Sequence, residues 1–173
     1  MQVGSVLLEK ESLRFFAAHF IARFGKDGKV ERETLHGHNY RMIVRVAGQK
    51  QSNQAYIIDK NEIQEICLKI CRQFHSKMLI PRLSPALGIS EKDNHVFMQV
   101  KGTDEIFQFP KGDCLILDLE YTSIEGLASH CAKLIKEELM KNQDNSHLTE
   151  IYVTIREYQG LECQMCEQLQ AKL

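Results

Sequence analysis

Two histidines one residue apart, His36 and His38, have the clearest metal-binding chemistry in this sequence. They precede a segment, residues 40–46, in which apolar and polar side chains alternate as they do in a strand. Residues two apart on a strand point to the same face, so the two imidazoles are expected to project side by side. Neutral imidazoles suit a tetrahedral zinc ion, at zinc–nitrogen distances of about 2.0–2.1 Å. Gly37 between them has no side chain and lets the backbone or a ligand approach closely.

His19 is the candidate third ligand. It ends the apolar, strand-like run 15–19, where an isolated histidine is more often a packed or hydrogen-bonded core residue. Antiparallel pairing of residues 13–21 with residues 40–46 would bring it beside the other two histidines. Three histidines that leave a fourth position open are typical of a catalytic zinc and not of a structural one. The sequence therefore predicts a zinc site at His19, His36 and His38.

Turn residues and periodic segments predict the elements that hold these histidines. Two glycines and an aspartate within 23–29 predict the loop that leads from His19 to His36. Asp59 is expected to cap a helix whose apolar residues recur at spacings of three and four. Thr122-x-x-Glu125 forms a capping box ahead of a second such helix. Strands are predicted at 5–9, 13–20, 40–46, 56–58, 95–101, 105–109, 114–119 and 151–155, with a loop over 81–94.

Strands and helices that do not alternate one for one favour an α+β fold, in which two helices cover one face of a mostly antiparallel sheet. The 173 residues are most simply a single domain, 1–173, large enough to bury a sizeable core.

Composition narrows the class of protein. A net charge of −1 gives no reason to expect nucleic acid or a membrane as partner. No segment has the length of a transmembrane helix, and the N-terminal residues lack a signal-peptide pattern. Six scattered cysteines indicate reduced thiols in a cytoplasmic protein, and the C-x-x-C at 163–166 is interpreted as incidental.

The motif Ala17-Ala18-His19, followed after a loop by His36-Gly37-His38-Asn39-Tyr40, resembles the zinc signature of the 6-pyruvoyl-tetrahydropterin synthase family. The family includes the 6-carboxytetrahydropterin synthases of the queuosine pathway. The segment 57–59 and the residues entering the second helix are also similar to it. The resemblance implies a tunnelling fold (T-fold), whose sheets join edge to edge into a barrel. It also implies a homotrimer or homohexamer with Zn2+ as cofactor and a pterin as substrate.

Glu157 follows the last predicted strand, where the family places a glutamate that holds the pterin ring. One carboxylate can accept two hydrogen bonds, from the 2-amino group and the adjacent ring N–H. The alternative is a solvated charge at the end of a strand.

The sequence departs from typical family members at two catalytic positions. They carry a cysteine a few residues before H-G-H as general base, but no cysteine lies between residues 19 and 36 here. Glu33, three residues before the motif, resembles the glutamate that replaces this cysteine in a subgroup. Glu31 is the alternative base, and both could be charges on an exposed loop. The family's Asp-His pair is replaced by His75-Ser76, so His75 is either a proton relay or a surface histidine.

The resemblance implies a zinc-dependent lyase that acts on 7,8-dihydroneopterin triphosphate. The resemblance to the glutamate-bearing subgroup implies side-chain cleavage to 6-hydroxymethyl-dihydropterin. Elimination to the 6-pyruvoyl product and formation of the 6-carboxy product are the alternatives implied by cysteine-bearing members. A non-catalytic, zinc-containing pterin-binding module and a structural zinc protein remain as alternatives from other classes.

Overall fold

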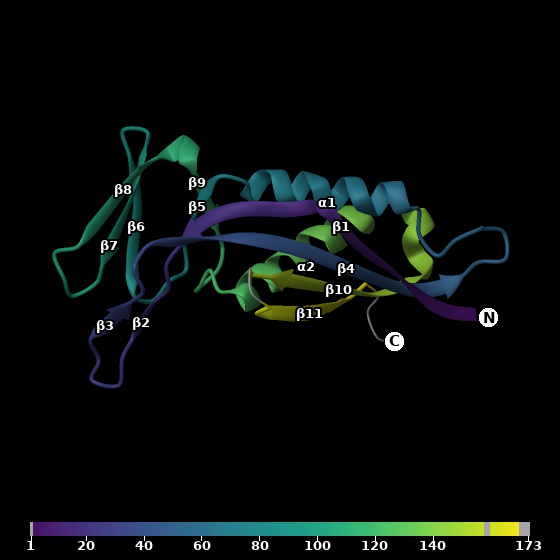
Figure 1. Ribbon diagram of the computed structural model, residues 1–173, viewed down its shortest axis with the longest axis horizontal. Coiled ribbons are helices and arrows are strands. Elements are labelled where there is room, and N and C mark those ends of the chain that lie inside the picture. The colour runs from purple at the N-terminus through teal and green to yellow at the C-terminus, as the bar shows by residue number, and fades with distance from the viewer. Residues whose placement is uncertain (1, 158–159, 170–173) are drawn as a thin grey trace.

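A computed structural model describes residues 2–157 and 160–169, and its largest sheet has six strands (Figure 1). Their order is β11-β10-β4-β1-β5-β9. The central strands β1 and β4 pair antiparallel, whereas β5 is parallel to β1 and β9 is parallel to β5. The sheet is therefore mixed, with an antiparallel centre. The strand bounds are β1 Gln2–His19, β4 His36–Lys50, β5 Lys77–Pro81, β9 Cys114–Leu117, β10 Leu148–Arg156 and β11 Glu162–Gln168.

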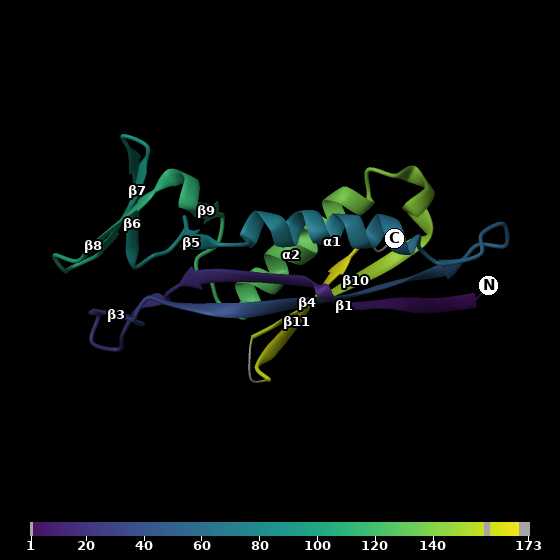
Figure 2. The same ribbon diagram turned by 45° about the horizontal axis from the view of Figure 1, so that its top comes forward.

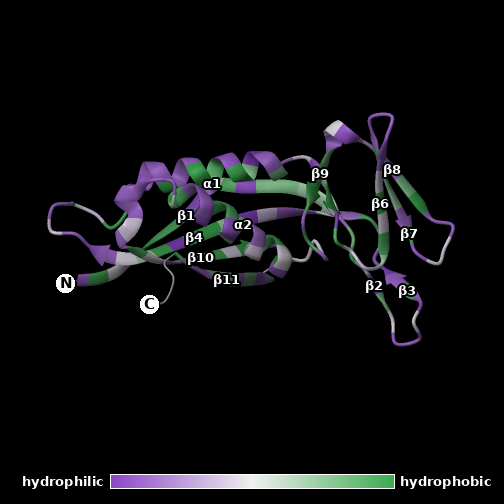
Figure 3. Cartoon of the chain, turned by 180° about the vertical axis from the view of Figure 1, so that it is seen from behind, coloured by the Kyte–Doolittle hydropathy of each residue, from purple (hydrophilic) through white to green (hydrophobic). Residues whose placement is uncertain are grey.

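Two helices, α1 (Lys60–Phe74) and α2 (Ile124–Leu139), cover one face of this sheet, as predicted (Figure 2). Their buried residues recur at spacings of three and four, so each helix has one apolar side. Figure 3 shows apolar and polar residues alternating along both helices. Asp59 caps α1, because its carboxylate accepts from the Asn61 N–H at 2.8 Å. The cap of α2 is Ser123 and not the predicted Thr122, since the Ser123 hydroxyl accepts from the Gly126 N–H.

A smaller part of the molecule lies at the end of β1 where His19 is found (left in Figure 1). It consists of the hairpin β2 (Ala22–Phe24) and β3 (Val30–Arg32) and of a three-stranded sheet, β6 to β8. The strands of that sheet are β6 Leu87–Lys92, β7 His95–Val100 and β8 Ile106–Pro110, and the 3-10 turn η1 (Lys111–Asp113) follows β8. A second 3-10 turn, η2 (Gln143–His147), lies elsewhere, between α2 and β10. Apolar residues of the three-stranded sheet pack on Phe20, Met78 and Ile80 in a second core cluster.

Three sequence predictions of secondary structure are wrong. Residues 56–58 form no strand, because the Ile57 carbonyl accepts from His147 Nε2 at 2.6 Å and lacks a ladder partner. The predicted loop over 81–94 contains β6, which forms a hairpin with β7. The turn between them is made by Asp93 and Asn94, both at positive φ, as the tight two-residue turns of hairpins require. The break expected at 10–12 is only a register shift inside the continuous strand β1.

The strand β11 was not predicted. It pairs antiparallel with β10 at the edge of the sheet and carries Cys163 and Cys166. Positions three apart on a strand point to opposite faces, so this C-x-x-C cannot form a two-thiol site. Within the described residues, no helix is long and apolar enough to cross a membrane.

Candidate metal centre and substrate site

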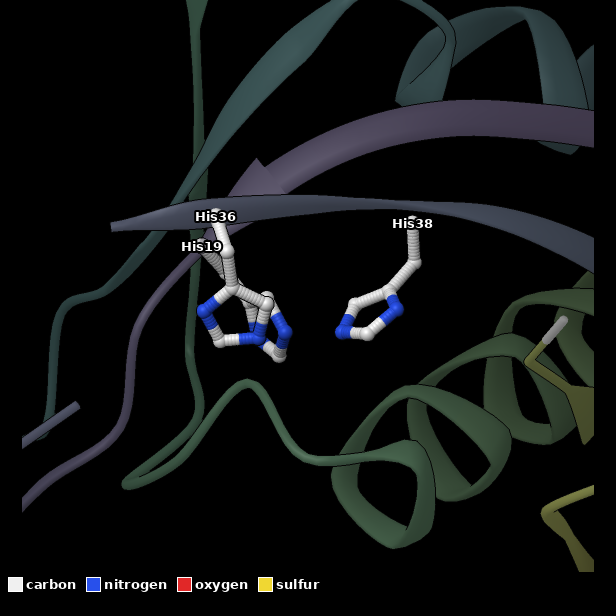
Figure 4. Close-up of side chains that lie close together, drawn as sticks. All are labelled: His19, His36 and His38. Atoms are coloured by element: carbon white, nitrogen blue, oxygen red, sulfur yellow. The ribbon is translucent and has the colours of Figure 1, made fainter. Parts of the chain in front are cut away.

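The pairing of β1 with β4 brings the three predicted metal ligands together (Figure 4). His19 lies opposite His36, and Ala17 lies opposite His38, so all three imidazoles project from one face of the sheet. Their ring centroids are 4.7–5.3 Å apart. One nitrogen from each ring lies within 4.8 Å of the others. The rings point toward the segment that precedes α2.

Hydrogen bonds at the far side of two rings fix their orientation. His36 Nδ1 lies 2.7 Å from the Thr34 carbonyl oxygen, which can only accept. Nδ1 therefore carries the proton, and Nε2 keeps its lone pair for a metal. His19 Nδ1 lies 3.2 Å from the hydroxyl of the fully buried Thr122, and His19 Nε2 lies 3.3 Å from the Tyr40 hydroxyl.

His19 is only 2% exposed, and this burial lowers its pKa to about 4. After burial, the charges of His36 and His38 are the next causes of this lowered pKa, whereas Thr122 and the Glu33 carboxylate oppose the shift. His19 is therefore neutral at pH 7, as a metal ligand must be. Three imidazoles on one face, two of them oriented by outer hydrogen bonds, fit a zinc ion. His19, His36 and His38 are the residues that would hold it.

Glu33 is held two residues beyond the candidate ligand His19 by hydrogen bonds to Ile21. Its N–H donates to the Ile21 carbonyl at 2.9 Å, and its carboxylate accepts from the Ile21 N–H at 3.0 Å. Ile21 is two residues beyond His19, so these bonds hold the carboxylate at the end of β1. Its negative charge opposes the lowering of the His19 pKa. The pKa of the Tyr40 hydroxyl is raised chiefly by burial and then by the charges of Glu157 and Glu33.

Glu157 reaches the same face from β10. Ile151, Val153 and Ile155 alternate toward the core, and Glu157 continues that alternation by one step. Its side chain is 13% exposed, and Oε1 lies 3.8 Å from His38 Nε2. A largely buried carboxylate beside the histidines is suited to bind ring N–H groups.

His75 is not part of this group within one subunit. Its exposed ring packs on Phe16, with 4.6 Å between ring centroids. Phe16 alternates with Phe15 and Ala17, which face the helices, so it belongs to the uncovered face of the sheet. A cavity of ≈ 740 Å³ next to it is lined by Phe16, Ser76 and Lys77 among others.

Two residues of the site were missed or misinterpreted in the sequence. Thr122 was assigned to a helix cap, but it contacts His19, which is 103 positions away. Tyr40 was noted only as part of a motif, yet its buried hydroxyl lies 3.3 Å from His19 Nε2, and the charges of Glu157 and Glu33 raise its pKa. The tyrosine could have been suspected from its place on the same strand face as His36 and His38. Nothing in the sequence points to the threonine contact.

The sequence model of the 6-pyruvoyl tetrahydropterin synthase family matches residues 8–166. The chain belongs to this family. A protein of Methanocaldococcus jannaschii, provisionally assigned as a 6-carboxy-5,6,7,8-tetrahydropterin synthase, is 26% identical over 145 residues, which are 84% of each chain. The family and the T-fold predicted from the sequence are confirmed, and family members are lyases that act on pterins.

Solved structures of the family superpose closely on this chain. The 6-pyruvoyl tetrahydropterin synthase of Plasmodium vivax is 27% identical, with a TM-score of 0.87 over 97% of this chain and 99% of that chain. Two variants of the Plasmodium vivax enzyme, in which a catalytic glutamate is replaced by alanine or by cysteine, are 25% identical, with TM-scores of 0.86. The chain is therefore a pterin lyase of this family.

Proposed function

We propose that the chain is a zinc-dependent enzyme that acts on 7,8-dihydroneopterin triphosphate and cleaves its side chain to yield 6-hydroxymethyl-dihydropterin. In this proposal His19, His36 and His38 hold zinc, Glu33 is the general base, and Glu157 binds the pterin ring. Zinc, when bound, supplies Lewis acidity toward the hydroxyl groups of the substrate side chain.

The position of Glu33 is the main support for its proposed role as general base. A general base must lie within hydrogen-bond reach of the proton that it removes. The Ile21 N–H holds the Glu33 carboxylate two residues beyond the proposed ligand His19, and no cysteine lies in the segment between His19 and His36, which supports Glu33 as the base. The catalytic glutamate named for the Plasmodium vivax enzyme supports the same assignment. The carboxylate of Glu33 removes a proton from a side-chain hydroxyl, while Glu157 accepts hydrogen bonds from the ring and fixes its orientation.

Product analysis tests this reaction. Cleavage between the first and second side-chain carbons leaves the triphosphate on a two-carbon aldehyde, whereas elimination releases inorganic triphosphate. Zinc-loaded protein is incubated with the substrate, and both products are identified by mass. We expect 6-hydroxymethyl-dihydropterin without inorganic triphosphate. Release of inorganic triphosphate with a 6-pyruvoyl product would overturn the proposed cleavage, and pterin binding without turnover would favour a non-catalytic module.

Glu33→Gln tests the base, and Glu31→Gln is its matched control on the same segment. General bases contribute about 10²–10⁴-fold to a rate, so Glu33→Gln should lower kcat by that factor. Glu31 is exposed and pairs with Arg23 at 3.6 Å, so Glu31→Gln should leave kcat within about twofold. The reverse pattern would make Glu31 the base.

A second candidate is a 6-carboxytetrahydropterin synthase. The relative in Methanocaldococcus jannaschii, which is provisionally assigned that activity, favours it. The same product analysis separates the two, because this reaction ends in a carboxylic acid at position 6 of the pterin.

We also propose a homotrimer or homohexamer in the cytoplasm. One face of the six-stranded sheet is free of helices, and its edge strands β9 and β11 have no further partner within the described residues. Within one chain His75 does not reach the zinc site. In the proposed assembly, His75 of one subunit meets the zinc site of its neighbour. All six cysteines are free, as expected for a reducing compartment. Light scattering should give three or six times the 20.0 kDa mass of the chain, and a monomer would exclude the assembly.

A further inference from the structure

Arg32, the residue directly before Glu33, joins the β2–β3 hairpin to the three-stranded sheet. Its guanidinium lies over the rings of Phe20 and Phe107, with 5.8 and 5.1 Å from Cζ to the ring centroids. Its Nε also donates to the carboxylate of Glu105, which follows the turn between β7 and β8. Only 28% of the Arg32 side chain is exposed. A planar guanidinium held by two ring faces and a carboxylate has little freedom to move.

The partners of Arg32 are themselves fixed. Phe20 is 2% exposed and packs on Phe107, with 4.8 Å between ring centroids. The turn that presents Glu105 is closed by a bond from the Val100 N–H to the Glu105 carbonyl at 3.0 Å. The Glu105 N–H also donates to the Thr103 hydroxyl at 3.1 Å. The residues of the three-stranded sheet that contact Arg32 are therefore held in fixed positions.

The same guanidinium also contacts the backbone of Glu33. Arg32 Nη1 donates to the Glu33 carbonyl oxygen at 2.9 Å. The two bonds with Ile21 hold the N–H and the carboxylate of Glu33, and Arg32 holds its carbonyl. Glu33 is exposed and lies just beyond the end of β3, so these three bonds are what define its position.

We propose that Arg32 is a positioning residue for Glu33, and that the β6–β8 sheet serves the site by holding Arg32 in place. The proposal rests on the proposed role of Glu33 as general base. Arg32 contacts neither the histidines nor Glu157 in the described contacts, so it should affect proton transfer without changing metal or pterin binding. Arg32 has a matched control in Arg23, which lies on the same hairpin but pairs only with the exposed Glu31 among the described ion pairs.

Steady-state kinetics of Arg32→Ala test the proposal. A displacement of a catalytic group by about 1 Å can cost about 100-fold in rate. We expect kcat to fall by about 10- to 100-fold, with KM within twofold and one zinc per chain retained. Arg23→Ala should keep full kcat. Millimolar guanidinium ion should restore part of the lost rate, because it can occupy the position over the Phe20 and Phe107 rings that the Arg32 side chain leaves.

A double variant separates positioning from a general structural effect. If Arg32 acts through Glu33, adding Arg32→Ala to Glu33→Gln should cause less than a twofold further loss. Losses that multiply in the double variant, or an unchanged kcat in Arg32→Ala alone, would overturn the proposal. Should Arg32→Ala fold poorly, Glu105→Gln and Phe107→Leu release the same guanidinium and should lower kcat by about threefold or more, with KM unchanged. Full kcat in both would equally overturn it. If Glu33→Gln itself retains full turnover, Glu33 is not the base. That result refutes the proposed function and is distinct from a failure of the Arg32 contact.

Discussion

The burial of His19 makes the stability of the metal-free protein depend on pH. The native pKa of this imidazole is about 4, whereas the ordinary histidine value is 6.5. Between these values the unfolded chain binds a proton that the native protein does not bind, so the free energy of unfolding falls as the pH falls from 6.5 to 4. At about 1.36 kcal/mol per pH unit, the loss amounts to about 3 kcal/mol. Above pH 6.5 the contribution is fully present.

Urea unfolding of protein stripped of metal with a chelator measures this loss. The free energy of unfolding is measured at pH 7.5 and at pH 4 for wild type and for His19→Gln. For each protein, the loss is the value at pH 7.5 minus the value at pH 4. Burial also lowers the pKa of His130, but this contribution is present in both proteins and cancels. We expect wild type to lose about 3 kcal/mol more than His19→Gln. Equal losses in the two proteins would refute the inferred effect of burial on His19.

Two further predictions concern the ring-binding carboxylate and the thiols. Glu157→Gln should raise KM by about 10- to 100-fold, because hydrogen bonds to a charged group contribute about 1.5–3 kcal/mol, and its zinc content should be unchanged. An unaltered KM would remove Glu157 from the site. At pH 8, a thiol reagent should label the exposed Cys166 quickly. The buried thiols should react only after unfolding, since burial raises the pKa of Cys71 to about 12 and shields all three from the reagent: Cys67, Cys71 and Cys131. Rapid labelling of these three would contradict the packing of α1 on α2.

The parts of the fold that follow local rules were predictable from the sequence. The strand alternation after His36 and His38 was sufficient to predict that strand, and its expected antiparallel pairing with the segment of His19 is confirmed. Spacings of three and four, with Asp59 as cap, were sufficient for α1. In each case the signal lies within a few residues, because it reflects which face of one element is buried.

The parts that depend on distant contacts were not predictable. Strand β11 is mostly polar and lies at a sheet edge, so it lacks the apolar alternation that identifies a strand. Thr122 reaches His19 only because α2 packs over the sheet. The ion pair of Arg32 with Glu105 joins residues 73 positions apart. A single sequence contains no local signal for such pairs, although they orient the side chains of the site.

Metal analysis of the purified protein tests the central claim most directly. After incubation with zinc and removal of the excess, we expect one zinc ion per chain. His36→Ala should retain almost none, whereas His75→Ala, which changes a histidine on the uncovered face, should retain one. A wild-type protein that takes up no zinc, or a His36→Ala variant that binds as much zinc as wild type, would contradict the three-histidine site.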